Sequence, residues 1–190
     1  MSATANKIRY GLKNVYYSVL TEGTPDAYAT PVAIPGAVNI SLSPVGDTTT
    51  FIADDTEYFV SQGNNGYDGT LEIAHIPESF LTDVMGEVAD TKNVVFEKSE
   101  AQPKHFALLF EFTGDQHQIR HVLYKCLATR ANIEGNATVN KEIKTTVLNL
   151  TCRPNSAGYV KAKTKSDTDS TVYGNWYTTV QTFDAGGGEE

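Results

Sequence analysis

The sequence predicts a mainly β fold, a β-sandwich or rolled barrel with one short α-helix at its flank. Thr is the most frequent residue and Val and Tyr are plentiful, whereas Leu and Met are comparatively few. Branched and aromatic side chains fit a pleated sheet better than a helix, so this composition favours strands. Hydrophobic residues make up 40% of the chain, which is enough for the core of a single domain over residues 1–190.

Alternating apolar and polar residues mark the expected strands. Val38, Ile40 and Leu42 alternate with polar neighbours, a pattern typical of a half-buried strand. Strand-like segments also occur at residues 8–20, 57–61, 67–76, 107–112, 118–127 and 144–152. We further expect an N-terminal arm at residues 1–13 and a flexible acidic tail at residues 184–190.

Two turn signals predict hairpins. Gly114-Asp115 separates two strand-like segments and predicts that they pair. Asn65-Gly66, the end of the run Gly63-Asn-Asn-Gly66, supplies the positive φ angles that a tight turn needs. We therefore expect a second hairpin turn at Asn65 and Gly66.

One segment has helical rather than strand periodicity. Pro77 suits the first position of a helix, where its missing N–H is no loss. Four apolar side chains follow at helical spacing: Phe80, Leu81, Val84 and Val88. The pattern predicts a helix over about residues 77–88 that packs these side chains onto one face of the sheet.

Residues 44–55 differ from the strands around them. The segment is polar at both ends, yet it carries the adjacent apolar residues Phe51 and Ile52. A long polar excursion with two exposed apolar residues is typical of a binding loop, so we expect an inter-strand loop here.

Charge and cysteine content exclude several classes of protein. The net charge of −8 argues against unaided nucleic-acid binding, which needs Lys and Arg to displace counterions. Cys126 and Cys152 each lie in an apolar strand-like run, which favours two buried free thiols in a reducing compartment. No run approaches the ~20 apolar residues of a membrane helix, and the first residues lack the apolar core of a signal peptide. We expect neither membrane insertion nor export.

Candidate chemical sites are weak, and we expect no enzyme activity, cofactor or metal. His117 and His121 are four residues apart, which on a strand is roughly 13 Å and too far to share one zinc ion. Gly63-Asn-Asn-Gly66 lacks the following Lys-Ser or Lys-Thr of a phosphate-binding loop. No nucleophile elbow is present.

Three stretches resemble the major tail proteins of long-tailed bacteriophages, of the phi13-like type. The first is residues 34–49, with Gly46-Asp47-Thr48-Thr49 as its most telling part. The second comprises residues 58–60, 64–73 and 76–77, and the third residues 103–112, 120–124 and 133–135. The similarity covers roughly residues 8 to 165 in order.

The resemblance implies a virion protein of a siphovirus, assembled in the bacterial host cytoplasm. Such tail tube proteins form hexameric rings that stack into a hollow tube, and DNA passes through the lumen without specific binding. The implied partners are further copies of the chain, the tape measure, the baseplate or tail tip, and the terminator. A long loop in the family reaches the neighbouring ring, which by position implies inter-ring contacts for Asp47, Thr48, Thr49, Phe51, Ile52, Asp54 and Asp55.

Two other classes stay open at the level of the sequence. A β-sandwich carbohydrate-binding or adhesion module would use Trp176 or Tyr173 as a stacking platform. An acidic glycosidase would use Asp54, Asp55 and Glu57, provided that two of these carboxyls faced each other across a cleft.

Overall fold

A computed structural model describes residues 6–135 and 143–184 of the chain. The strands are β1 (Arg9–Thr21), β2 (Ala27–Tyr28), β3 (Val32–Ala33), β4 (Ala37–Val45), β5 (Thr48–Ala53), β6 (Thr56–Gln62), β7 (Gly66–Ile73), β8 (Val88–Ala89), β9 (Val95–Phe96), β10 (Phe106–Gly114), β11 (Ile119–Ala128), β12 (Thr146–Arg153) and β13 (Lys161–Lys163). The helices are α1 (Glu78–Asp83) and α2 (Ser170–Gly174).

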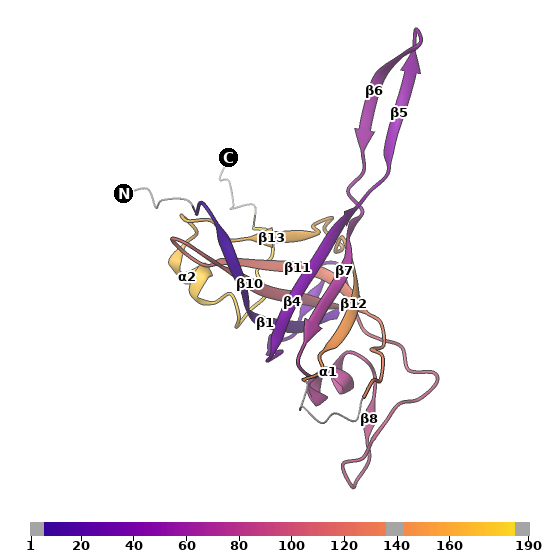
Figure 1. Cartoon of the computed structure of the whole chain (residues 1–190), viewed down its shortest axis with the longest axis vertical. Helices are drawn as coiled ribbons and strands as arrows, with labels where there is room; N and C mark the ends of the chain where they lie inside the picture. Colours follow the sequence, from indigo (N-terminus) through magenta and orange to yellow (C-terminus); the bar gives the residue numbers. More distant parts are fainter. Residues whose placement is uncertain (1–5, 136–142, 185–190) are drawn as a thin grey trace.

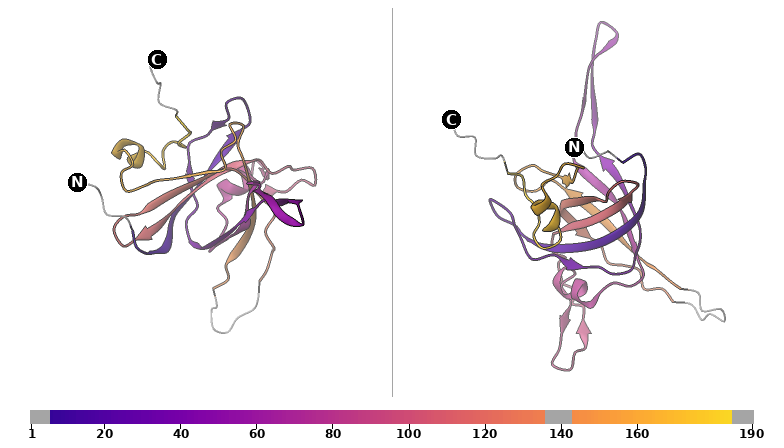
Figure 2. Two further views of the ribbon diagram at one scale, coloured as in Figure 1. Left: turned by 90° about the horizontal axis from the view of Figure 1, so that it is seen from above. Right: turned by 90° about the vertical axis from the view of Figure 1, so that its left-hand side faces the viewer.

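A nine-stranded antiparallel sheet forms the body, and it curls into an open roll (Figure 2). Its order is β2-β1-β10-β11-β12-β7-β4, with β3 beside β1 and β13 beside β11. The roll does not close, because the described part of β4 pairs only with β7 and no ladder joins it to β1. The predicted mainly β fold with a short flanking helix is therefore confirmed, in its open form.

Strand β10 is buried on both faces. Phe106, Leu108 and Phe110 point into the main core, which also contains residues from β1, β7, β12 and α1. Ala107 and Leu109, on the alternate face, pack in a second cluster with Trp176 and Val180. The C-terminal segment thus covers the outer face of the sheet.

An ion pair locks that C-terminal segment onto the sheet. Glu111 is 4% exposed and accepts from Arg120 Nε at 3.2 Å, from the Tyr177 hydroxyl at 3.0 Å and from Asn14 Nδ2 at 2.8 Å. The Arg120 guanidinium lies 3.8 Å from the ring centre of Tyr173 and 4.9 Å from that of Tyr177. Its charge is therefore satisfied by a carboxylate and by two aromatic faces.

Helix α1 begins as predicted but ends early. Phe80 and Val84 are buried against the sheet and Leu81 is half-buried, as the helical spacing indicates. Val88, predicted to be the fourth packing residue, is instead 50% exposed and belongs to β8. Gly86 has a φ of +79°, a left-handed conformation that ends helices and turns the chain away before Val88.

Several other expectations are refined. Residues 9–13 of the predicted N-terminal arm are the first part of β1, and residues 1–5 lie outside the described residues. The predicted tail at 184–190 lies outside them too, apart from its first residue. The hairpin at Gly114-Asp115 is confirmed by the pairing of β10 with β11.

The two cysteines face each other across the β11–β12 ladder. Cys126 is paired directly with Cys152, both thiols are buried and unbridged, and their sulfur atoms are 2.7 Å apart. Burial raises the pKa of the Cys126 thiol well above its usual value, and the neighbouring Cys152 adds to the effect. The prediction of two buried free thiols is confirmed.

Candidate functional site

The most distinctive feature of the molecule is a two-stranded arm, β5–β6, that projects from one end of the roll (Figure 1). Every residue of the arm is exposed except Ala53, which is half-buried. Five large apolar side chains are between 52% and 74% exposed on it: Phe51, Ile52, Tyr58, Phe59 and Val60. An isolated two-stranded hairpin is only marginally stable in water. A second molecule that covered this apolar surface would stabilise the arm.

A tight two-residue turn forms the tip of the arm. Asp54 and Asp55 have φ angles of +52° and +59°, the left-handed conformations of a type I′ turn. Ala53 and Thr56 pair across this turn, and the Thr56 hydroxyl donates to the Ala53 carbonyl at 3.1 Å. The predicted inter-strand loop at residues 44–55 is therefore wrong in form, because this segment is the first half of a hairpin.

The arm continues the β4–β7 ladder rather than starting a new one. Val45 pairs with Gly66 at the top of the roll, and Thr48 pairs with Gln62 at the base of the arm. The joint between them is held by Asn65 N–H, which donates to the Val45 carbonyl at 2.8 Å. At the same joint Gly63 N–H donates to the Asp47 carbonyl at 2.9 Å.

The joint corrects the predicted turn at Asn65 and Gly66. These residues do not close a hairpin, because the strands before and after them, β6 and β7, pair with β5 and β4 instead. Gly66 has a φ of +114° and Asn65 is not in a left-handed conformation. Gly46 lies opposite Gly63 at this joint, and a Cβ added to Gly46 would overlap the Gly63 carbonyl. The two chain segments of the joint can therefore approach this closely only with glycine at position 46.

The residues predicted to make inter-ring contacts all lie on the arm or at its joint. Thr49 pairs with Ser61, Phe51 with Phe59 and Ile52 with Glu57, so the ladder skips Tyr58 at a bulge. Sequence reasoning missed the apolar residues of the returning strand. Their signal was the consecutive apolar run Tyr58-Phe59-Val60, which the prediction treated as an ordinary strand.

The carboxylates proposed for a glycosidase lie at the convex tip of the arm. Asp54 and Asp55 form the turn itself, and Glu57 lies one rung below it, all three exposed. Two carboxyls that cleave a glycoside face each other across a substrate-filled cleft, and this tip does not provide one.

Of the two aromatic residues proposed as a carbohydrate-stacking platform, Trp176 is buried and Tyr173 is half-buried. Trp176 is 3% exposed and donates from its indole N–H to the His121 carbonyl at 3.4 Å. One face of Tyr173 is covered by Arg120. Trp176 therefore anchors the C-terminal segment to the sheet.

The two histidines that were considered as metal ligands lie in different elements of the fold. His121 lies on β11 with a ring stacked on Phe110, whereas His117 lies in the preceding turn. Among the described residues no three His, Cys, Asp or Glu side chains are grouped to hold a metal ion. No helix in the described ranges has the length and apolar character to cross a membrane.

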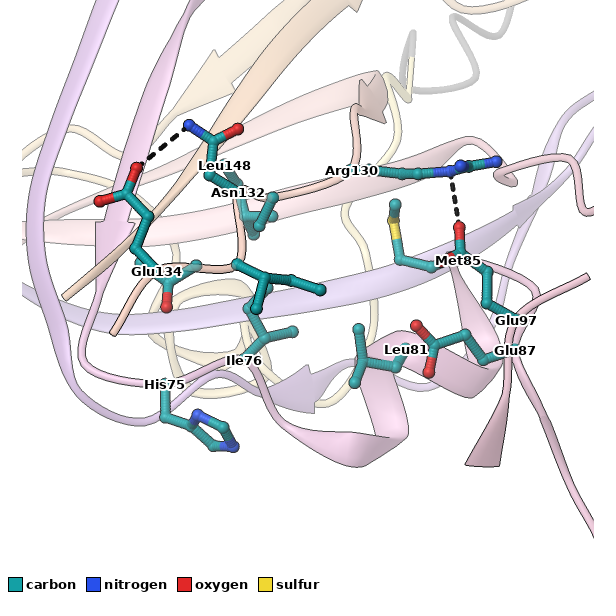
Figure 3. Close-up of a pocket in the computed structure, with 13 residues that line it drawn as sticks. His75, Ile76, Leu81, Met85, Glu87, Glu97, Arg130, Asn132, Glu134 and Leu148 are labelled. Atoms are coloured by element: carbon teal, nitrogen blue, oxygen red, sulfur yellow. Dashed lines mark hydrogen bonds and ion pairs between the residues drawn. The ribbon is translucent and has the colours of Figure 1, made fainter. Parts of the chain in front are cut away.

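A cavity of about 660 Å³ opens beside α1 (Figure 3). Helix α1 lies at the end of the molecule opposite the arm (Figure 1). Ile76, Leu81, Met85 and Leu148 give it an apolar lining, and Arg130 bonds Glu97 at its rim with a distance of 2.6 Å. It is framed by α1 and by the connection from β11 to β12. The molecule thus has an exposed apolar arm at one end and an apolar hollow at the other.

Comparison with known proteins places the chain in no family. No protein-family model matches the sequence, and no curated protein is similar to it in sequence. A similar solved structure is the cryo-EM structure of the anti-feeding prophage cap (AFP tube terminating cap). The TM-score is 0.49 at 11% sequence identity, with 87% of this chain and 98% of that chain covered.

Proposed function

We propose that the chain is a structural tail tube protein of a long-tailed bacteriophage. It assembles into hexameric rings that stack into the hollow tube through which the phage DNA passes. The β5–β6 arm carries this proposal, because it presents five large exposed apolar residues where the resembled family has its inter-ring loop. The sequence resemblance over residues 8 to 165 supports this class of protein, and the arm supports this means of contact.

The arm supports assembly because it contributes no residue to either core cluster of the described fold. It packs on no other element of the described chain, and the roll has a complete core without it. When a second copy covers apolar surface that is exposed in the monomer, the free energy falls by roughly 25 cal/mol per Å² of surface covered. A contact from one end of a molecule onto a different surface of the next is heterologous, which generates rings and stacks rather than closed pairs.

The charge of the chain suits the proposed tube. A net charge of −8 repels the phosphate backbone, so DNA slides through an acidic lumen without binding to it. In this proposal the protein has no enzymatic activity, is assembled in the host cytoplasm and becomes part of the virion. The tail tip, the tape measure and the terminator are its other partners.

Electron microscopy of the concentrated protein, with light scattering alongside, tests the proposal. The wild-type chain should form rings or hollow tubes. The variant Phe51→Ser/Ile52→Ser should stay soluble and folded but should not stack, because the apolar contacts of the arm are lost.

A matched control removes exposed apolar surface elsewhere. Ile133→Ser/Ile143→Ser alters two exposed isoleucines on the β11–β12 connection and should assemble like the wild type. Normal stacking by the arm variant would contradict the role of the arm. A wild-type chain that stays monomeric at millimolar concentration would contradict self-assembly itself.

A further inference from the structure

The arm carries negative charge as well as apolar surface. Residues 46–62 contain Asp47, Asp54, Asp55 and Glu57 and no Lys, Arg or His. None of these four carboxylates forms an ion pair with another described residue. A partner surface for the tip therefore has to combine apolar contacts with positive charge.

A groove with that combination lies on the body, between β4–β7 and the β10–β11 pair. Its volume is about 180 Å³, and its apolar lining includes Ile40, Leu42, Phe110 and Phe112. An apolar cavity of about 150 Å³ accommodates a benzene ring, so this groove has room for one large apolar side chain.

Arg9 and Lys161 line the groove, and a third cation, Lys163, lies beside it next to His121. The Arg9 guanidinium lies 5.0 Å from the ring centre of Phe112, and Lys161 Nζ lies 4.5 Å from that of Tyr67. Lys163 pairs with His121 across β11 and β13, and it lies two residues from Lys161, hence on the same face. All three cations are exposed, and no carboxylate is among the described residues that line the groove.

The pKa of His121, which lines the groove, is affected by the same three cations. Its pKa is lowered to about 4, mainly by burial and in addition by the nearby Lys163, Arg9 and Lys161, which repel its protonated form. The imidazole is therefore neutral at pH 7, and the groove keeps its charge from Arg and Lys alone.

The tip of an arm cannot reach the groove of its own chain. Tyr67, at the edge of the groove, lies just past the joint at the base of the arm. The tip lies a whole strand away, about 20 Å for the six residues of β5, and the arm points away from the body (Figure 1). An acidic tip in this groove must come from another molecule.

We infer that the groove between Arg9, Lys161 and Lys163 receives the acidic, apolar tip of the β5–β6 arm of a second copy of the chain. This inference rests on the proposed self-assembly and names its acceptor surface. Asp54 and Asp55 face the cations, and Phe51 or Ile52 enters the apolar groove. Because tip and groove are different surfaces, every copy uses both, and the contact propagates.

A charge exchange tests the inference. Lys161→Glu/Lys163→Glu places acidic residues beside an acidic tip, and Asp54→Lys/Asp55→Lys places basic residues beside a basic groove. Each variant should raise the critical concentration for assembly at least tenfold, because like charges in contact oppose binding. The fourfold variant that carries both exchanges should return to within about threefold of the wild type.

The design separates local from global charge. The fourfold variant has the wild-type net charge of −8, since it loses and gains four units. Lys92→Glu/Lys98→Glu reaches the same −12 (−8 minus 4) as the groove variant, but through two exposed lysines of the β8–β9 region at the opposite end. This control should assemble normally, and circular dichroism should show that all variants are folded.

The possible results are distinct. If the groove variant assembles like the wild type while Phe51→Ser/Ile52→Ser does not, self-assembly stands and the acceptor lies elsewhere. Loss of assembly in the Lys92→Glu/Lys98→Glu control alone would place the acceptor at the opposite end and overturn the inference. Failure of the fourfold variant to recover, although it is folded, would overturn it as well.

Discussion

The roll and the β5–β6 arm are made of the same kinds of residues, yet only the roll buries them. Phe106, Leu108 and Phe110 of β10 are enclosed by neighbouring strands and by α1. Phe59 and Val60 of β6 are just as apolar but have only the paired strand β5 beside them. The comparison shows that apolar content determines how much surface needs covering, whereas topology determines whether the same chain covers it.

The free energy of the two regions differs accordingly. Burial in the roll stabilises the monomer, because each large side chain leaves water on folding. The apolar residues of the arm stay in water in the monomer, so they contribute to stability only when a second molecule covers them. Matched changes in the two regions should therefore separate folding from assembly.

The largest difference should be in thiol reactivity. A cysteine introduced in the arm, Ser61→Cys, should react with a thiol reagent at the rate of a free cysteine. Cys126 and Cys152 are buried, and burial raises the pKa of the Cys126 thiol, which lowers its reactive thiolate fraction at any given pH. They should react at least ~1000-fold more slowly, because the roll must unfold first.

Peptide mapping by mass spectrometry over a time course measures all three cysteines in one sample. The reagent should label Cys126 and Cys152 rapidly once urea unfolds the chain. Labelling of the native cysteines at the rate of the arm cysteine would mean that the β11–β12 ladder opens locally. It would contradict the prediction that the roll protects its cysteines until it unfolds.

The next largest effect should come from one substitution made in both regions. Phe80 packs edge-to-face against Tyr17 and Phe106, with ring centres 5.1 and 5.4 Å away, and is 1% exposed. Phe80→Ala should lower the free energy of unfolding by about 3–5 kcal/mol. Phe59→Ala, in the arm, should change it by less than about 0.5 kcal/mol.

Urea unfolding of the dilute, unassembled chain measures both values. The arm variant should instead weaken assembly, which the core variant affects only through folding. A large loss of monomer stability in Phe59→Ala would show that the arm packs on the body in solution.

Local sequence signals predicted the roll well, because they report on burial one strand at a time. The alternation of Ile40 and Leu42 with polar neighbours and the start of a helix after Pro77 both depend on neighbours within a few positions. Val38 departs from the predicted alternation, because it is 53% exposed at a register shift in the β4–β7 ladder. The end of the helix was mispredicted for the same reason. Val88 continues the helical spacing, but Gly86 turns the chain first, and a periodic pattern does not contain that conformation.

The arm was predicted only in part, because its form depends on strand pairing. Asn65-Gly66 has the composition of a tight turn, yet the chain there crosses a joint in a longer ladder, and the turn lies at Asp54-Asp55. Phe51 and Ile52 stood out from a polar context. The apolar residues of β6 did not stand out, because the sequence of β6 does not indicate that the body of the molecule ends at the joint.

A smaller effect is expected from the buried carboxylate of the roll and its counterpart on the arm. Glu111→Gln should destabilise the monomer by about 2–3 kcal/mol, because it leaves the Arg120 guanidinium without its carboxylate. Glu57→Gln, in an exposed position, should leave stability within about 0.5 kcal/mol of the wild type. Thermal or urea unfolding compares them directly. Equal effects of the two changes would mean that the Glu111 pair adds little to the attachment of the C-terminal segment.

The smallest expected effect concerns the stability of the arm itself. Asp55 holds a left-handed conformation, with a φ of +59°, which glycine adopts without steric strain. Asp55→Gly creates the Asp-Gly pair favoured in type I′ turns and should stabilise the arm by about 0.5 kcal/mol, roughly twofold in amide protection. Thr50→Gly, in the middle of β5, should lower protection by a similar factor, because glycine weakens a strand interior. Hydrogen exchange of the β5 and β6 amides in the unassembled chain measures both. Unchanged protection in both variants would mean that the arm is held by something other than its own turn and ladder.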